Sequence, residues 1–197
     1  MTELRKNYLT DATSGRTAAL DGMTDAIQTV TYEHHEIHAG SSFHAQVYSG
    51  SASAVNIAFK TPSGTKRAHM VFSWSSASSS HLSILEGATW TTNTGTVVAP
   101  TNQKRAASPG ASMLLEDKTA TPAFTANGVL TNVTIVSVGV AIREVYVFSD
   151  RKVGGDGSHQ AEIILKPDET YVMVLTSDDG AKALVLHLDW YEHTDKI

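Results

Sequence analysis

Apolar and polar residues alternate strictly near the C-terminus, and this is the clearest pattern in the chain. One face of residues 183–193 carries Leu184, Leu186, Leu188 and Trp190. The other face carries Ala183, Val185, His187 and Asp189. Successive side chains of a strand point to opposite faces, so this period of two predicts a strand with one buried face.

Shorter runs of the same kind extend over most of the chain. Alternation and β-branched residues predict further strands over residues 26–32, 43–48, 55–59, 69–75, 82–86, 112–115, 133–148 and 171–175. Gly139 lies within the longest apolar stretch and predicts a bulge or break there. Turn sequences such as 61–64, 166–170 and 177–180 separate the strands. About eight to ten short strands without a convincing amphipathic helix predict an all-β, antiparallel sandwich or jelly roll.

Three stretches lack this pattern. Residues 1–25 are polar and aperiodic, which predicts an extended N-terminal arm, with a short helix over 17–23 as the alternative, before one domain over 26–197. Residues 87–128 are rich in Gly, Thr, Asn and Ala and predict long loops, in which Trp90 is a candidate anchor for a partner. Val153–Gly157 is predicted to be a loop.

Composition narrows the classes of function. The 197 residues carry a net charge of −5, which argues against sequence-independent nucleic-acid binding. The chain has no cysteine, so disulfides and thiolate metal sites are excluded, and folding in a reducing cytosol is expected. No apolar run approaches the roughly 20 residues of a membrane helix, and the N-terminus does not resemble a signal peptide. We therefore expect neither nucleic acid nor membrane as a partner.

A histidine-rich segment is the sharpest chemical candidate. His34, Glu36 and His38 would share one face of a strand, where His193 or His44 could complete a metal site like that of a cupin. The order His-Glu-Ile-His is one residue short of the helical zincin motif. The structural alternative is a set of polar strand-end residues that hydrogen-bond to the last strand or to a neighbouring subunit. We expect the structural role, with no metal, no cofactor and no catalytic residue.

The tripeptide Tyr-Glu-His occurs twice, at 32–34 and at 191–193. This repetition predicts that 32–38 and 186–193 are the first and last strands of one sandwich and lie side by side. In that arrangement their histidines and glutamates would close a polar network near a subunit contact.

Four segments resemble a known family. They are Tyr-Glu-His-His-Glu-Ile-His-Ala-Gly-Ser-Ser-Phe at 32–43, Lys-Arg-Ala-His-Met-Val-Phe at 66–72, Ile-Ile-Leu-Lys-Pro-Asp-Glu-Thr-Tyr at 163–171 and Leu-His-Leu-Asp-Trp-Tyr-Glu-His at 186–193. Together they are similar to jelly-roll capsid decoration, or cement, proteins of tailed bacteriophages. The resemblance implies a jelly-roll sandwich that is made in the host bacterial cytoplasm and binds the outside of the phage head as a homotrimer. There it would clamp neighbouring major capsid subunits, without enzymatic activity.

The interface residues expected under this hypothesis come from the arm, the long loops and the last strand. They are Tyr8, Leu9, Leu20, Trp90, Lys104, Arg105, Tyr191, Glu192 and His193. Two alternatives remain open. The first is a phage neck, tail or fibre-head protein that binds a host receptor or glycan. The second is a cupin-like metalloprotein built on His34, Glu36 and His38.

Overall fold

The computed structural model describes residues 8–10, 17–19, 32–105, 111–117, 124–126, 128–148, 153–156 and 162–194. The chain divides into two compact units, Met1–His35 and Glu36–Ile197. In the first unit, β1 (Tyr8–Thr10) pairs antiparallel with β2 (Thr17–Ala19). This pairing contradicts the alternative of a helix beginning at residue 17. The other residues of the predicted arm, Leu20 among them, lie outside the described residues.

The histidine-rich segment is a helix, so the prediction of a strand over 32–38 is wrong. Helix α1 (Tyr32–Ala39) ends at Gly40, whose φ is 80°. The backbone N–H of Gly40 and that of Ser41 both donate to the carbonyl oxygen of Glu36, at 3.1 and 3.0 Å. A glycine in the left-handed region after the last turn is a common helix terminus, because glycine adopts this conformation without steric penalty. The strand that follows begins at Ser42, so residues 32–39 are not part of the sheet and form a helix instead.

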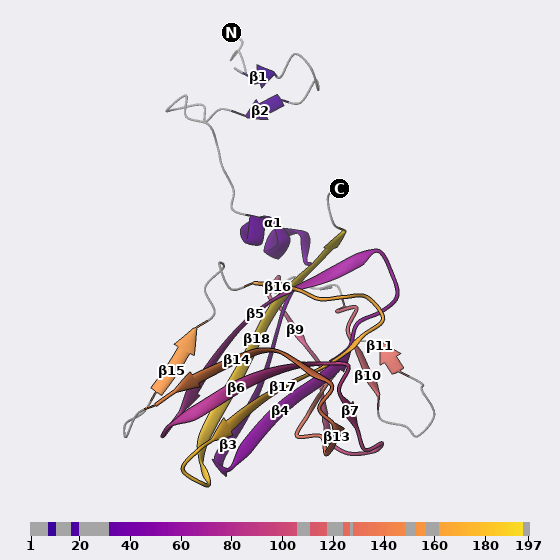
Figure 1. Cartoon of the computed structure of the whole chain (residues 1–197). Coiled ribbons are helices and arrows are strands. Elements are labelled where there is room, and N and C mark those ends of the chain that lie inside the picture. The colour runs from indigo at the N-terminus through magenta and orange to yellow at the C-terminus, as the bar shows by residue number, and fades with distance from the viewer. Residues whose placement is uncertain are drawn as a thin grey trace. The chain divides into compact units, whose positions relative to one another are not determined.

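The second unit contains two large antiparallel sheets and a smaller two-stranded one (Figure 1). The β18 sheet has the order β15 (Val153–Asp156), β5 (Lys66–Ser76), β18 (Lys182–Thr194), β3 (Ser42–Ala52) and β9 (Thr101–Asn102), and β16 (Ile163–Ile164) also pairs with β5. The β17 sheet has the order β11 (Phe124–Ala126), β10 (Leu115–Asp117), β4 (Ala54–Lys60), β17 (Thr170–Ser177), β6 (Ser80–Glu86) and β14 (Val140–Val147). Off this order, β12 (Val129–Thr131) pairs with β4 and with β8 (Thr96–Val98).

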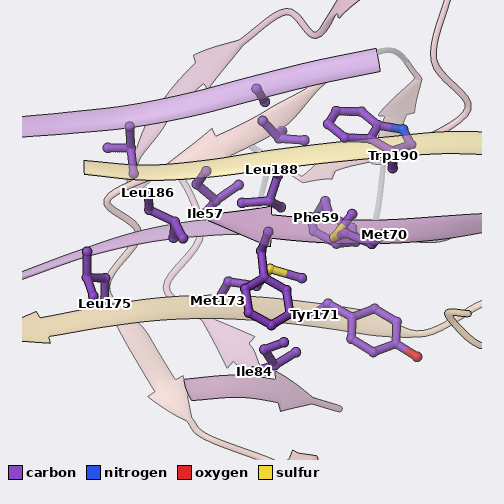
Figure 2. Close-up of a cluster of buried hydrophobic side chains, with 14 of the residues drawn as sticks. Ile57, Phe59, Met70, Ile84, Tyr171, Met173, Leu175, Leu186, Leu188 and Trp190 are labelled. Atoms are coloured by element: carbon purple, nitrogen blue, oxygen red, sulfur yellow. The ribbon is translucent and has the colours of Figure 1, made fainter. Parts of the chain in front are cut away.

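The inner faces of the two sheets form the main core, as the alternation of the sequence predicts. Leu184, Leu186 and Leu188 are fully buried and Trp190 is 1% exposed. Figure 2 shows Leu186, Leu188 and Trp190 of β18 together with Ile57, Phe59, Met173 and Leu175 from the other sheet. Burial of one such side chain stabilises the fold by about 1.5–3 kcal/mol. The predicted all-β antiparallel sandwich is confirmed, and Met70, Phe72 and Trp74 of the predicted strand over 69–75 belong to this core.

The predicted first and last strands need one correction. Among the described residues, the first strand of the sandwich is β3 and not 32–38, and β3 lies beside β18 with Ser42 opposite Tyr191. The last strand is as predicted and pairs on its other side with β5. Thus the two ends of the domain meet in the centre of one sheet.

Residues 87–128 are more regular than the predicted long loops. The described residues there form β7 (Thr89–Trp90), β8, β9, β10 and β11. They are followed by β12 and by β13 (Ile135–Ser137), which pairs with β7. The expected strand over 112–115 is instead β10, which begins at Leu115, and Val153–Asp156 is a strand and not a loop. These strands are two to four residues long, too short to carry an alternation that could be detected.

Part of this region covers the outer face of the β17 sheet. A second apolar cluster contains Ala58, Leu85, Leu130 and Val172 from the sheet, and Ala88 and Val133 from the covering segment. Ala58 lies between Ile57 and Phe59 of the main core, so it faces the opposite side of β4. Trp90 is partly buried against this second cluster, which gives it a packing role within the domain.

The predicted break at Gly139 is confirmed, since β13 ends at Ser137 and β14 begins at Val140. Gly139 has a φ of 60°, and a Cβ placed on it would lie 2.2 Å from the carbonyl oxygen of Glu86. The backbone crosses here from its pairing with β7 to its pairing with β6. Only glycine allows so close a crossing.

Candidate interaction surface

Most of the large apolar side chains that are exposed among the described residues lie along one stretch of the chain. They are Val136, Val138, Val140, Ile142, Tyr146 and Phe148, with exposures between 39% for Ile142 and 81% for Phe148. We call these six residues the β14 edge surface. Elsewhere in the described residues, only Tyr48 and Ile164 are large, apolar and exposed, and each comes from a different strand. Exposed apolar residues gathered in this way usually mark a contact surface.

The position of β14 in its sheet explains the exposure. In the order of described strands, β14 ends the β17 sheet and pairs only with β6. Val145 and Val147 pack inward against the main core, whereas Tyr146 lies opposite His81 on the outer face. A bulge between Ala141 and Arg143 shifts the register, so that Val140 lies opposite Glu86. Because a bulge exchanges the faces of a strand, the apolar side chains extend around the edge of the sheet.

Aromatic stacking holds the outer part of this surface in place. The ring of Tyr146 lies 5.2 Å from that of His81 and 6.3 Å from that of Phe148, measured between ring centroids. Nδ1 of His81 is 2.8 Å from Oδ1 of Asp178, in the turn after β17. An exposed ring that is already ordered loses little conformational entropy when a partner binds, which favours a role as an interface anchor.

Arg143 points to the inside of the same edge. Its guanidinium carbon lies 5.3 Å from the ring centroid of Phe72, a buried residue of the opposite sheet. A cation over an aromatic face is attracted by the ring quadrupole. An added strand on the β14 side would have to bury this charge further. Inward-pointing charges and bulges are two devices by which edge strands avoid strand-to-strand pairing.

The last strand carries a group of buried polar contacts around Glu192. The carboxylate of Glu192 is buried and accepts hydrogen bonds from Ser112 Oγ at 2.6 Å and Trp190 Nε1 at 2.9 Å. The backbone N–H of Met113 donates to both of its oxygens, at 3.0 and 2.9 Å. Burial raises the pKa of Glu192, and the hydrogen bonds from Ser112, Trp190 and Met113 oppose the rise. Glu192 thereby fixes residues 112–113 to the end of β18.

A second group lies on the other face of the same strand end. Tyr191 OH donates to Oε1 of Glu162 at 2.7 Å, and Nδ1 of His69 lies 2.5 Å from the same oxygen. The ring of His193 stacks on that of His69, with 4.1 Å between centroids. Tyr191 and Glu192 are therefore buried and bonded within their own domain, which accounts for both residues without a subunit contact. These contacts of Tyr191 and His193 are made with His69 of β5 and with Glu162, and not with the segment 32–38 as the sequence predicted.

The other candidates named from the sequence have separate positions. Lys104 and Arg105 are exposed after β9, and Tyr8 and Leu9 belong to β1. Glu36 and His38 are on α1, so the strand geometry that placed them on one face with His34 does not hold. His44 lies with Nδ1 3.0 Å from Oδ1 of Asp189, on the outer face of the β18 sheet. Across the described ranges, no group of three or more His, Asp and Glu side chains is arranged to hold a metal ion.

The sequence does not identify the β14 edge surface. Residues 133–148 are the longest apolar stretch, which is the available signal, but the pattern there predicts only a strand with a break at Gly139. Comparisons with family models, curated proteins and solved structures found no match to this chain. Within the described part of the chain, no helix is long and apolar enough to cross a membrane.

Proposed function

We propose that this protein is a virion structural protein, a decoration protein that binds the outside of a phage head and clamps neighbouring major capsid subunits. The observation that carries the proposal is the β14 edge surface, an apolar contact surface on a rigid sandwich. Such a surface suits a protein whose activity is binding other proteins. The sequence resemblance adds the phage context, and a non-enzymatic role follows from it.

The connectivity of the sandwich supports the finer fold that this family would have. The eight main strands follow the chain as β3, β4, β5 and β6, then β14, β15, β17 and β18. They form one sheet in the order β15-β5-β18-β3 and one in the order β4-β17-β6-β14. A jelly roll is a double sheet of eight strands arranged as two Greek keys. We infer that the sandwich is a jelly roll.

The clamp would act through many weak contacts. In this proposal, residues 1–25 contact the capsid or a neighbouring decoration subunit, and the exposed Lys104 and Arg105 contact the capsid surface. Each contact of an oligomer raises the effective concentration of the next one. Binding can then be strong overall although each contact is weak.

The test is binding to expanded phage heads that lack decoration protein. The full chain is expected to saturate sites on the head, and a chain without residues 1–25 is expected to show reduced occupancy at the same concentration. Occupancy is measured by sedimentation of the heads followed by quantification of the bound protein. Undiminished occupancy would remove the arm from the mechanism, and absence of binding by the full chain would refute the proposal.

A receptor- or glycan-binding fibre head is the second candidate. The exposed stacked rings of Tyr146 and Phe148 favour it, because aromatic faces pack against sugar rings. Trp90 does not favour it, since this side chain packs against the second apolar cluster. Copy number separates the two functions: a decoration protein is present in hundreds of copies per virion and a fibre head in few. Glycan-array binding by the full chain, lost in Tyr146→Ala, would favour the fibre head.

A further inference from the structure

We infer that the β14 edge surface is the contact between copies of this chain, and that the contact is made by packing of side chains and not by addition of a strand. This inference deepens the proposed function, since it names the partner of the surface on which that function rests. It commits to a second copy as the occupant. The capsid and other proteins are alternatives that the experiment distinguishes.

The amount of apolar surface fits a permanent subunit contact. The six residues are between 39% and 81% exposed. Together they leave on the order of 600 Å² of side-chain surface open, near the roughly 800 Å² that each partner buries in a standard interface. Contacts between identical subunits are the most apolar class of interface, with charged residues depleted at the centre.

The charges of the region agree with this assignment. Between residues 136 and 148, the charged residues are Arg143 and Glu144. Arg143 is directed inward to Phe72 and away from the surface. Glu144 is the remaining charge and lies near Ser83 Oγ, at 3.5 Å. The surface therefore offers few groups that could form ion pairs with a charged partner. An equally apolar partner would bury apolar side chains on both sides of the contact.

The partner must also be present whenever the chain is folded. A surface of this kind causes non-specific association if it stays open, so it favours a partner that is available at equal concentration from the start. A second copy of the chain meets this condition. A symmetry axis beside β14 would bring the edge surface of each copy against that of the next.

The geometry of the edge favours packing over strand addition. The bulge between Ala141 and Arg143 interrupts the regular ladder, and Arg143 occupies the inner side of the edge. Both features oppose the addition of another strand. Tyr146 and Phe148 are in contrast ordered by stacking and extend from the outer face, where a partner can pack on them.

The test is the mass of the full chain in solution, measured by sedimentation velocity or light scattering over a range of concentrations. The wild type is expected at a multiple of the 21.1 kDa chain mass. Phe148→Glu and, separately, Val138→Lys are expected to raise the dissociation constant by at least about 30-fold, the effect of losing one interface hot spot. Both residues are well exposed, so unchanged circular dichroism is expected.

Tyr48→Glu is the matched control, because Tyr48 is 66% exposed but lies on β3, outside the surface. It is expected to leave the mass unchanged. A monomeric wild type, or substituted chains that remain oligomeric, would overturn the inference. A monomer that still binds heads would leave the proposed function standing, whereas an oligomer that does not bind heads would refute only that function.

Discussion

The strands β18 and β14 are both rich in apolar residues, yet one is buried and the other forms a surface. β18 lies between β3 and β5, and its apolar face is covered by the opposite sheet. β14 pairs only with β6 among the described strands, and a bulge turns its apolar residues around the edge. Neighbours and register, and not hydrophobicity, decide whether an apolar strand contributes to stability or to association.

The largest difference between the two strands is expected in stability. Leu188→Ala should lower the free energy of unfolding by roughly 2–5 kcal/mol, because it leaves a cavity in the main core. Val138→Ala in the β14 edge surface should change it by less than about 0.5 kcal/mol in monomeric conditions. Urea unfolding followed by tryptophan fluorescence measures both values. Equal effects would mean that the edge surface is part of the core.

A substitution in the connection into β14 is expected to lower stability nearly as much as one in the main core. Gly139→Ala should lower the free energy of unfolding by about 1–3 kcal/mol from backbone strain alone, since residue 139 has a φ of 60°. The close approach of Glu86 adds to this loss.

Gly64→Ala is the control for this substitution. A Cβ on Gly64 would meet no atom within 4 Å, and no left-handed φ is recorded there. Its stability should be unchanged or slightly higher, by less than about 1 kcal/mol. Thermal unfolding of the two variants side by side decides whether the crossing at Gly139 is as close as described.

The third prediction concerns the pH dependence of stability, to which the buried Glu192 of β18 contributes. Its pKa is raised in the folded protein, so the folded state holds the proton more tightly than the unfolded state. The favourable contribution is therefore complete at low pH and is lost as the pH rises from the ordinary glutamate value through the raised one. Glu192→Gln should remove this component of the pH dependence, and chemical unfolding at a series of pH values measures it. An unchanged profile would assign the pH dependence to other groups.

The smallest effect on stability is expected at Arg143, on the side of β14 that faces the opposite sheet. Arg143→Leu removes the inward charge beside Phe72. Stability should change by less than about 1 kcal/mol, the contribution of an exposed cation–π contact. Slow association through strand addition should increase, because the edge loses a feature that opposes it. Thioflavin T fluorescence over days, compared with Glu144→Leu, tests this, and equal rates would show that Arg143 does not protect the edge.

Several elements could be predicted from the sequence because their signal is local. The last strand, the break at Gly139 and the turn between β17 and β18 follow from alternation and from turn-forming residues. The helix α1 was missed because its polar residues carry no apolar period, and the glycine that ends it also fits a turn. The short strands between residues 87 and 139 depend on pairing with distant segments, which no local pattern records.

The sequence by itself determined that the chain forms an all-β sandwich, and it identified the side chains of the main core. Alternation contains this information because a strand has two faces and water is excluded from one of them. The tertiary structure alone decided that β14 ends a sheet, that Arg143 turns inward and that Glu192 is buried. These properties depend on which segments, far apart in the chain, become neighbours.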